Sequence, residues 1–333
     1  AATQDLNPES IADRTTVGVF FRQAARYGDK PLIHYRQGDA WQVETWADMR
    51  RHVLAVASAL IAAGVKPRDS VLLISENRVE WMYCDFAIQT IGAVTVPVYP
   101  NSPAEMAQTI AADSGATYAI ASGAPLAAKL KLAGALNQIA TMDGEVADWV
   151  RQPELNLAEI AARSSRVTPE DICTIVYTSG TTGAPKGVEL AHRNLVDTAR
   201  AAVQVHPVTD RDSSLSWLPL AHVFGRINEM FDGMVYGGET WISAGSDHLV
   251  EELQQVKPTV MCSAPRVYEK MHAAVIARVQ KASPAKRAIF RWAVSTGTRF
   301  SQAEKPGPVL KAQRRLADRL VLAGLRRQLT GGR

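Results

Sequence analysis

Cysteines are few and long hydrophobic runs are absent in this sequence of 333 residues. The three cysteines, Cys84, Cys173 and Cys262, are odd in number and far apart, which favours buried thiols over a disulfide framework or a zinc site. No stretch reaches the ~18 to 20 consecutive apolar residues of a membrane span, and residues 1–14 lack the charged-then-apolar order of a signal peptide. With 47% hydrophobic residues, these absences predict a cytoplasmic globular protein of roughly two domains.

Acidic residues are scarce in residues 266–333, which hold 16 Lys and Arg against 3 acids, whereas residues 1–265 hold 21 against 30. Leu316, Leu320, Leu325 and Leu329 recur near helical spacing among these basic residues. Two interpretations stay open: a solvated helical face, or a face for an anionic membrane surface, which would make the protein peripheral at the inner face of the membrane. Because few aromatic side chains there could stack on bases, we expect no nucleic acid partner.

Apolar residues alternate between the spacing of strands and that of helices through residues 10–121. Thr45 is the predicted N-cap of one helix, residues 123–152 are Ala-rich and irregular in pattern, and residues 153–169 form a polar connection. The order of elements predicts an α/β fold of doubly wound, mostly parallel sheets with helices on both faces. We predict helices at 10–27, 46–63, 81–90 and 103–113, a hairpin of strands at 31–35 and 41–43, and strands at 70–74, 94–98 and 118–121.

A hydroxyl- and glycine-rich loop then follows, with the sequence Tyr177-Thr178-Ser179-Gly180-Thr181-Thr182-Gly183-Ala184-Pro185-Lys186-Gly187. Residues 172–177 before it and 188–190 after it have the pattern of strands, so the loop is predicted to join two strands. Glycines there allow φ > 0, which turns successive N–H groups toward an anion, while the hydroxyls add donors and Lys186 adds a positive charge. We therefore interpret the loop as a binding site for a triphosphate.

Two other interpretations of this loop are weaker. The Walker A loop has the form G-x-x-x-x-G-K-[ST] before a helix, but here Gly187 takes the place of the hydroxyl residue and a strand is predicted to follow. A surface hairpin is the plainer alternative, since Gly, Thr and Pro are common in turns. The run of specified residue types is too long for that alternative to be preferred.

The segment T-S-G-T-T-G-x-P-K-G resembles the nucleotide loop of the acyl-adenylate-forming superfamily. In that family the loop holds the β- and γ-phosphates of Mg-ATP while a carboxylate attacks the α-phosphorus, and the acyl-adenylate then passes its acyl group to a thiol. The resemblance implies that Lys186 is catalytic and that Thr178 is the magnesium ligand. It implies phosphate binding by Thr178, Ser179, Gly180, Thr181, Thr182, Gly183, Lys186 and Gly187.

A second segment, Leu218-Pro219-Leu220-Ala221-His222-Val223-Phe224-Gly225-Arg226, resembles a core motif of long-chain fatty acyl-CoA synthetases. A lone histidine beside apolar residues is more often a packing group than a ligand. The resemblance nevertheless implies that His222 is catalytic and lies, with Val223 and Phe224, beside the carboxylate and the α-phosphate in an electrostatic role. Gly225 stands where those enzymes usually have glutamate. Residues 265–270, P-R-V-Y-E-K, resemble a further signature of the same subgroup, and Ser263 before them is the expected N-cap of a helix.

The resemblance covers nearly the whole chain but only about the first half of the family's length. It implies an incomplete N-terminal adenylation domain at 1–333, with a subdomain at 66–204 that carries the phosphate loop and a second, incomplete one formed by 1–65 and 205–333. The family's adenine, ribose and hinge motifs and its C-terminal lid domain would follow Arg333. We therefore expect a fragment of a longer enzyme, and we expect these 333 residues alone to be inactive.

The parent enzyme would be a long-chain fatty acid-CoA ligase that requires ATP, Mg2+ and coenzyme A. Its partners would be the fatty acid, ATP and CoA, and a homodimer stays open. One alternative is a fatty acyl-AMP ligase that loads a carrier protein. Another, from a different class, is a non-catalytic nucleotide-binding or membrane-surface module.

Overall fold

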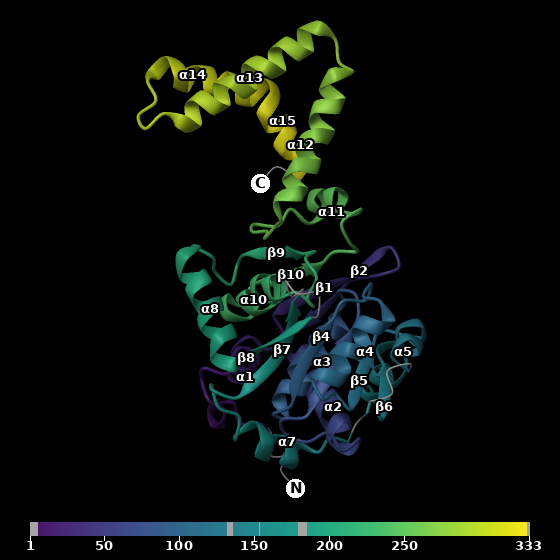
Figure 1. Ribbon diagram of the computed structural model, residues 1–333. Helices are drawn as coiled ribbons and strands as arrows, with labels where there is room; N and C mark the ends of the chain where they lie inside the picture. Colours follow the sequence, from purple (N-terminus) through teal and green to yellow (C-terminus); the bar gives the residue numbers. More distant parts are fainter. Residues whose placement is uncertain (1–5, 132–135, 153, 179–184, 332–333) are drawn as a thin grey trace. The chain divides into compact units, whose positions relative to one another are not determined.

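The structure is a computed structural model that describes residues 6–131, 136–152, 154–178 and 185–331. These residues form two compact units, 1–243 and 244–333, and each is considered by itself. The first unit holds both β-sheets and the second is helical (Figure 1).

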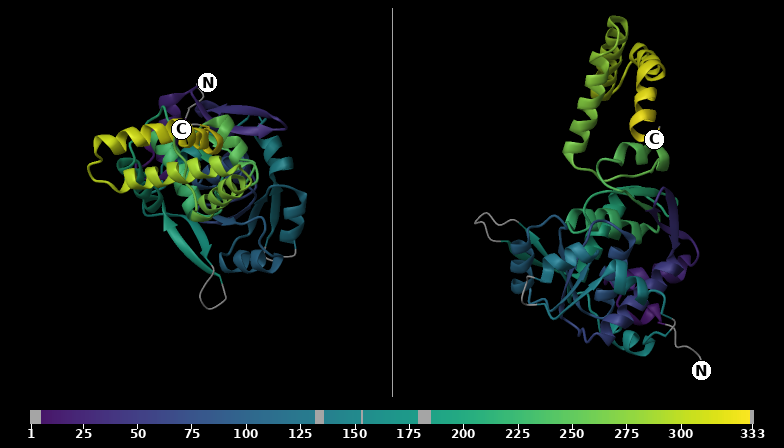
Figure 2. Two further views of the ribbon diagram at one scale, coloured as in Figure 1. Left: turned by 90° about the horizontal axis from the view of Figure 1, so that it is seen from above. Right: turned by 90° about the vertical axis from the view of Figure 1, so that its right-hand side faces the viewer.

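The larger sheet of the first unit has six strands in the order β6-β5-β3-β4-β7-β8. All neighbours in it are parallel except β7 and β8, which form an antiparallel pair at one edge (Figure 2). The strands are β3 (Ser70–Ile74), β4 (Val94–Val98), β5 (Tyr118–Ala121), β6 (Gln138–Thr141), β7 (Ile172–Thr178) and β8 (Lys186–Ala191). This confirms the predicted mostly parallel sheet and the two strands that flank the glycine-rich loop.

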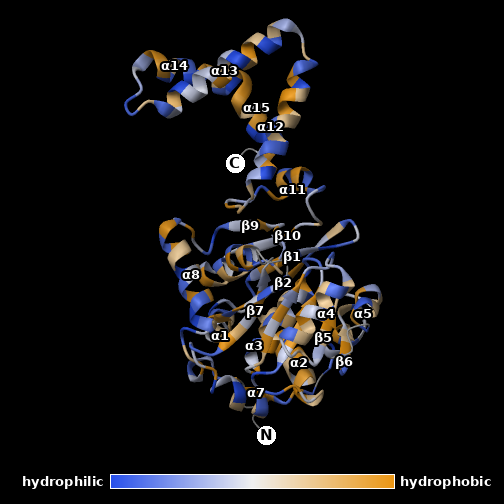
Figure 3. Ribbon diagram, in the orientation of Figure 1, coloured by the Kyte–Doolittle hydropathy of each residue, from blue (hydrophilic) through white to orange (hydrophobic). Residues whose placement is uncertain are grey.

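Helices cover both faces of this sheet because its central strands are apolar on both sides. In β3, Val71 and Leu73 belong to one hydrophobic cluster, whereas Leu72 and Ile74 belong to another. The first cluster includes α1 (Thr16–Tyr27), α2 (Trp46–Ala62), α3 (Val79–Thr90) and α7 (Leu157–Ser164), and the second includes α4 (Ala104–Asp113) and α5 (Ala124–Lys131). Figure 3 shows the hydrophobic colouring concentrated on these central strands and on the helices beside them.

A smaller sheet has four strands in the order β2-β1-β10-β9. Its first two strands, β1 (Pro31–Gln37) and β2 (Ala40–Thr45), form the predicted hairpin, and β9 (Ser213–Ser216) and β10 (Glu239–Ile242) continue it in parallel. Between β8 and β10 the chain forms α8 (His192–Val205), α9 (Val223–Gly225), the π-helix η3 (Arg226–Phe231) and α10 (Asp232–Tyr236).

The second unit is formed by helices with few buried side chains. They are α11 (Leu249–Val256), α12 (Pro265–Gln280), α13 (Pro284–Gln302), α14 (Pro308–Ala317), the π-helix η4 (Asp318–Leu322) and α15 (Ala323–Thr330). Within the described residues, α12 and α15 contain no buried residue. Among the helices described here, none combines the length and the hydrophobicity needed to cross a membrane.

Several predicted boundaries were wrong. The helix expected at 10–27 begins only at Thr16, because the Thr15 side chain caps it by accepting from the Gly18 N–H at 2.9 Å. The irregular stretch 123–152 contains α5, β6, the π-helix η2 (Met142–Val146) and α6 (Ala147–Trp149), and the polar connection 153–169 contains α7. The N-cap expected at Ser263 is Ala264, since Pro265 suits the first helical position.

Cys84 and Cys173 are buried, and Cys262 is only partly buried.

Candidate functional site

A pocket of about 370 Å³ lies at the carboxyl ends of β4 and β7. Tyr99 follows β4, Thr178 ends β7, Met106 and Ile110 come from α4, and His222 immediately precedes α9. In open α/β sheets ligands bind outside the carboxyl ends of the strands. The pocket lies at that edge of the sheet, beside β4 and β7.

His222 is exposed at this pocket and its tautomer is set by the helix that it precedes. Its Nδ1 accepts a hydrogen bond from the backbone N–H of Phe224 at 3.1 Å, so a neutral imidazole carries its proton on Nε2. The ring centroid lies 6.5 Å from that of Tyr99. His222 can thus donate a hydrogen bond from Nε2 to an anionic group in the pocket.

The loop that leads to His222 is held by side chains that sequence reasoning missed. Asn77, just beyond the carboxyl end of β3, donates to the Leu218 carbonyl at 2.7 Å and accepts from the Leu220 N–H at 2.9 Å, so one amide spans Pro219. From the opposite direction the Glu229 carboxyl accepts from the Leu218 N–H at 3.0 Å. These bonds fix both sides of the proline, and they fix the approach of the chain to His222.

Glu229 is buried, and this changes its chemistry. Burial raises the pKa of Glu229 to about 8, although hydrogen bonds from the Leu218 backbone and the Ser216 hydroxyl favour the charged form. Burial also raises the pKa of Asp232, one turn further on, to about 7. Two acids with raised pKa values thus lie in the helical segment that follows His222. Their sequence positions indicate nothing of this, because burial is a tertiary property.

The hairpin of β7 and β8 carries the remaining predicted residues that the structure describes. Thr178 and Lys186 are paired across the two strands, and both side chains are exposed. A Cβ on Gly187 would lie 2.9 Å from Ile175 Cγ2 and 3.0 Å from the Tyr177 ring, so glycine is needed for that ring to pack there. The predicted phosphate-binding residues Ser179, Gly180, Thr181, Thr182 and Gly183 lie outside the described residues.

Only part of the predicted set meets at one place. Thr178, His222 and Val223 line the same pocket, although 44 residues separate Thr178 from His222 in the sequence. Phe224 is 47% exposed and does not line it. Lys186 is exposed beside Pro185, which does line it, and within the described part of the chain its ammonium group makes no ion pair. An exposed cation and a hydroxyl at the end of β7, with a histidine opposite, suit an anionic ligand.

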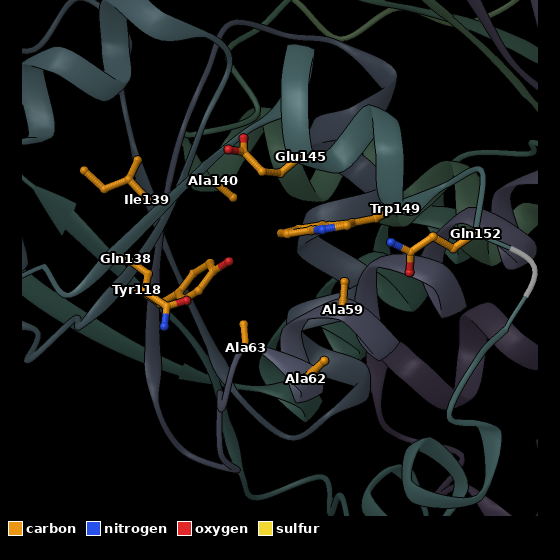
Figure 4. A pocket seen from close by; sticks show the side chains of 10 residues that line it. All are labelled: Ala59, Ala62, Ala63, Tyr118, Gln138, Ile139, Ala140, Glu145, Trp149 and Gln152. Carbon is orange, nitrogen blue, oxygen red and sulfur yellow. The ribbon is translucent and has the colours of Figure 1, made fainter.

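Two other depressions lie at the opposite ends of the strands. One, of about 530 Å³, is lined by Tyr118 and Gln138 at the amino ends of β5 and β6, with Trp149 and Glu145 facing them (Figure 4). The Glu145 carboxylate there already accepts from the Thr141 hydroxyl and N–H, each at 2.7 Å. Another, of about 660 Å³, adjoins the amino ends of β3 and β4. Neither gathers the predicted residues.

Comparison with known proteins identifies the family of the chain. Residues 20–332 match the AMP-binding enzyme family, and the chain belongs to that family. Long-chain-fatty-acid–CoA ligase FadD15 of Mycobacterium bovis is 33% identical over 97% of this chain and 56% of its own length. Long-chain-fatty-acid–CoA ligase ACSBG1 of Homo sapiens is 28% identical over 93% of this chain and 46% of its own length. The chain thus spans about half the length of the curated relatives it matches.

Solved structures share the fold. The fatty acyl-adenylate ligase of L. pneumophila, in complex with acyl adenylate and pyrophosphate, has a TM-score of 0.66 at 23% identity and covers 85% of this chain and 49% of its own. The N-terminal domain of FACL13 from Mycobacterium tuberculosis has a TM-score of 0.67 at 22% identity, covering 77% of this chain and 64% of its own. The predicted α/β architecture and the resemblance to adenylate-forming enzymes are confirmed.

Proposed function

We propose that this chain is the nucleotide- and acid-binding part of a long-chain fatty acid–CoA ligase. The enzyme would activate a fatty acid with ATP to an acyl-adenylate and would then form the thioester with coenzyme A. The observation that carries the proposal is the pocket that brings Thr178 and His222 together at the carboxyl ends of parallel strands. Family membership and the names of the relatives support it.

In the first step a carboxylate oxygen forms a bond to the α-phosphorus, and the bond from that phosphorus to the β-bridging oxygen breaks, releasing pyrophosphate. Lys186 and the loop at 178–183 would offset the charge of the β- and γ-phosphates. His222 would donate from Nε2 to the carboxylate and hold it in line. In the second step the thiol loses its proton, its sulfur bonds to the carbonyl carbon, and AMP leaves.

Magnesium fits this site in a limited way. The Thr178 hydroxyl is a hard oxygen donor at the exposed end of β7, and Mg2+ is commonly held by one or two protein oxygens together with substrate phosphates. When bound, the ion would neutralise charge on the phosphates. Thr178 is the residue we propose for it.

We further propose that coenzyme A is the acyl acceptor and that the chain divides into two subdomains. Residues 66–204 would be the subdomain that carries the phosphate loop, and 1–65 with 205–333 the second subdomain of an adenylation domain completed by sequence beyond this chain. The 333 residues alone would then not catalyse the full reaction. The alternatives are acyl transfer to a carrier protein, and a non-catalytic module that binds nucleotide.

The test is fatty-acid-dependent exchange between ATP and pyrophosphate in the intact protein. Lys186→Ala and His222→Ala should each lower kcat about 100-fold or more, since each removes a group that stabilises charge in the transition state. His206→Ala, at an exposed histidine outside the site, is the control and should leave the rate unchanged. ATP binding without any carboxylate-dependent exchange would contradict the ligase and favour the module. Product analysis with CoA and with a carrier protein separates the two acceptors.

We also propose that the second unit binds an anionic membrane surface, which would place the enzyme at the inner face of the membrane. On α14 and η4, Leu316 and Leu320 are 50% and 58% exposed and lie four residues apart. Lys311, Arg315 and Arg319 are also exposed and spaced by four, and Arg315 and Arg319 directly precede the two leucines in the sequence. An exposed apolar stripe next to a basic one is what an interfacial helix requires.

Vesicle sedimentation tests the membrane proposal. Vesicles that contain phosphatidylserine should bind the protein more tightly than phosphatidylcholine alone, and added salt should weaken the binding. Leu316→Ser with Leu320→Ser should lower the affinity by about 10-fold or more, because the stripe would no longer insert. Val205→Ser, at a side chain 77% exposed in the first unit, is the control. Equal binding to both vesicles would contradict the proposal.

The homodimer stays a prediction that light scattering can test.

A further inference from the structure

Arg226 is a fully buried arginine one helical turn beyond His222. It is 1% exposed, and its Nε donates to the Asp85 carboxylate at 3.0 Å while a terminal nitrogen donates to the other carboxylate oxygen. The second terminal nitrogen donates to the Thr174 hydroxyl at 2.7 Å. The guanidinium carbon lies 5.4 Å from the Trp81 ring centroid and 5.7 Å from that of Phe231. The planar guanidinium of Arg226 therefore donates hydrogen bonds to Asp85 and Thr174 at the same time, next to two aromatic rings.

The Thr174 hydroxyl joins this pair to the sheet at a particular place. It accepts from Arg226 and donates to the Thr95 carbonyl of β4 at 2.7 Å. Thr95 and Thr174 are the residue pair that sets the register of β4 against β7. Four residues further along the chain from Thr95 and Thr174 lie Tyr99, just beyond β4, and Thr178, at the end of β7, and both line the pocket. Arg226 is thus tied to the junction of the two strands whose carboxyl ends form the site.

On its other side Arg226 is tied to His222. The Arg226 backbone N–H donates to the His222 carbonyl at 2.9 Å, so His222 belongs to the turn that Arg226 completes. The same turn includes the bond from the Phe224 N–H to the His222 ring. One side chain consequently connects the histidine to β7, and this connection lies inside the protein, where it cannot be replaced by water.

We infer that Arg226, held by Asp85 and Thr174, is a positioning residue that places His222 relative to the end of β7. The inference rests on the proposed function, because adenylation requires a carboxylate held by one element to meet a phosphate held by another. Displacement of reacting groups by about 1 Å can cost about 100-fold in rate. A loss of this connection should therefore lower kcat more than it lowers the affinity for ATP.

The matched pair Thr174→Val and Thr174→Ser tests this in the intact protein. Valine keeps the shape of threonine but removes the hydroxyl that joins Arg226 to β4, whereas serine keeps it. We expect Thr174→Val to lower kcat for fatty-acid-dependent exchange by about 10- to 100-fold with an ATP Kd within about 3-fold of wild type. Thr174→Ser should stay close to wild type. Equal kcat in the two variants would overturn the inference.

A second experiment separates positioning from stability. Removing one partner of a buried ion pair leaves an uncompensated charge, but replacing both by apolar residues of similar volume often preserves stability. The double variant Asp85→Leu with Arg226→Met should therefore regain much of the Tm lost in Asp85→Leu, while kcat stays low. Recovery of kcat together with Tm would mean a merely structural pair and would overturn the inference.

A readout that does not depend on catalysis keeps the inference separate from the proposed function. Should wild type show no carboxylate-dependent exchange, the ligase proposal fails, and the ring nitrogens of His222 can still be followed by NMR. We expect one tautomer in wild type and Thr174→Ser, with the proton on Nε2, and mixed tautomers in Thr174→Val. Identical spectra in all three proteins would show that Arg226 does not position His222.

Discussion

At the scale of single residues, Glu229 links the stability of the protein to pH. The pKa of Glu229 in the folded protein is about 8, above the ordinary 4.5, so between these pH values the folded state binds more protons than the unfolded state. The protonated Glu229 therefore contributes stability that is fully present below pH 4.5 and is lost as the pH rises to 8. The loss is on the order of 5 kcal/mol, at about 1.4 kcal/mol per pKa unit. Glu229→Gln keeps the shape and an acceptor for Leu218, and it should remove this slope from urea unfolding between pH 5 and 8. The exposed Glu304→Gln should leave the slope unchanged.

His192 acts in the opposite direction. Burial lowers its pKa to about 4 from 6.5, and its Nδ1 lies 2.8 Å from the Thr16 hydroxyl. The unfolded chain therefore binds a proton first as the pH falls, and stability decreases from pH 6.5 to 4 by on the order of 3 kcal/mol. His192→Gln should flatten urea unfolding free energies over that range, and His206→Gln should not. An unchanged acid slope in His192→Gln would count against a buried neutral imidazole.

Sequence reasoning found residues that line the pocket but not the residues that hold them in place. His222 and Thr178 belong to short segments whose residue types are specified by chemistry. Asp85 lies 141 positions before Arg226, and Asn77 lies 143 positions before Leu220, so no local pattern links the partners. Side chains that meet only because two elements pack together carry no periodicity of their own.

At the scale of elements, Gly225 lets the segment that follows His222 approach the preceding loop. A Cβ there would lie 2.5 Å from the Pro219 carbonyl oxygen and 3.1 Å from Leu218 Cβ. Gly225→Ala should destabilise the protein by about 1 to 3 kcal/mol through this overlap, although alanine is the better helix former. Gly297→Ala is the control, because its Cβ would meet Leu322 Cδ1 at an ordinary 3.6 Å. Thermal unfolding measures the stability of both variants. An unchanged stability of Gly225→Ala would contradict the close approach of the two segments.

The start of α2 is set by a capping box. The Thr45 hydroxyl accepts from the Asp48 N–H at 3.1 Å, and the Asp48 carboxylate accepts from the Thr45 N–H at 3.2 Å. Thr45→Ala should cost about 1 kcal/mol in unfolding free energy, whereas Thr45→Ser should cost little because it keeps the hydroxyl. Urea denaturation measures both, and equal losses would show that the methyl group matters more than the cap.

Elements with clear caps and periods were predicted well, and those without them were not. Thr45 marks α2 correctly, and the strands β3, β4 and β5 have the expected bounds because short apolar runs between turn residues leave little choice. In 123–152, by contrast, alanine suits a helix without marking its face, and β6 is a strand because it pairs with β5. Pairing of that kind is decided between elements and not within them.

At the scale of the whole molecule, the two units differ in how much they bury. All but one residue of α3 are buried, whereas within the described residues α12 buries none. Amide hydrogens of α3 should therefore exchange at least about 100-fold more slowly than those of α12, since exposed helices open locally. Hydrogen exchange of the 333-residue chain with mass spectrometry measures this. Equal protection would show that α12 is covered, for instance by a second copy.

What the sequence determined by itself was local. Alternating apolar periods determined the α/β class, and two segments of specified residue types identified the AMP-binding family and three residues of the pocket, Thr178, His222 and Val223. Tertiary structure alone decided which distant groups meet: the Asn77 amide with the backbone of Leu218 and Leu220, and the Asp85 and Thr174 side chains with Arg226. The physical reason is that burial and pairing depend on the packing of whole elements, whereas helix caps, turns and phosphate-binding loops depend on neighbours in the chain.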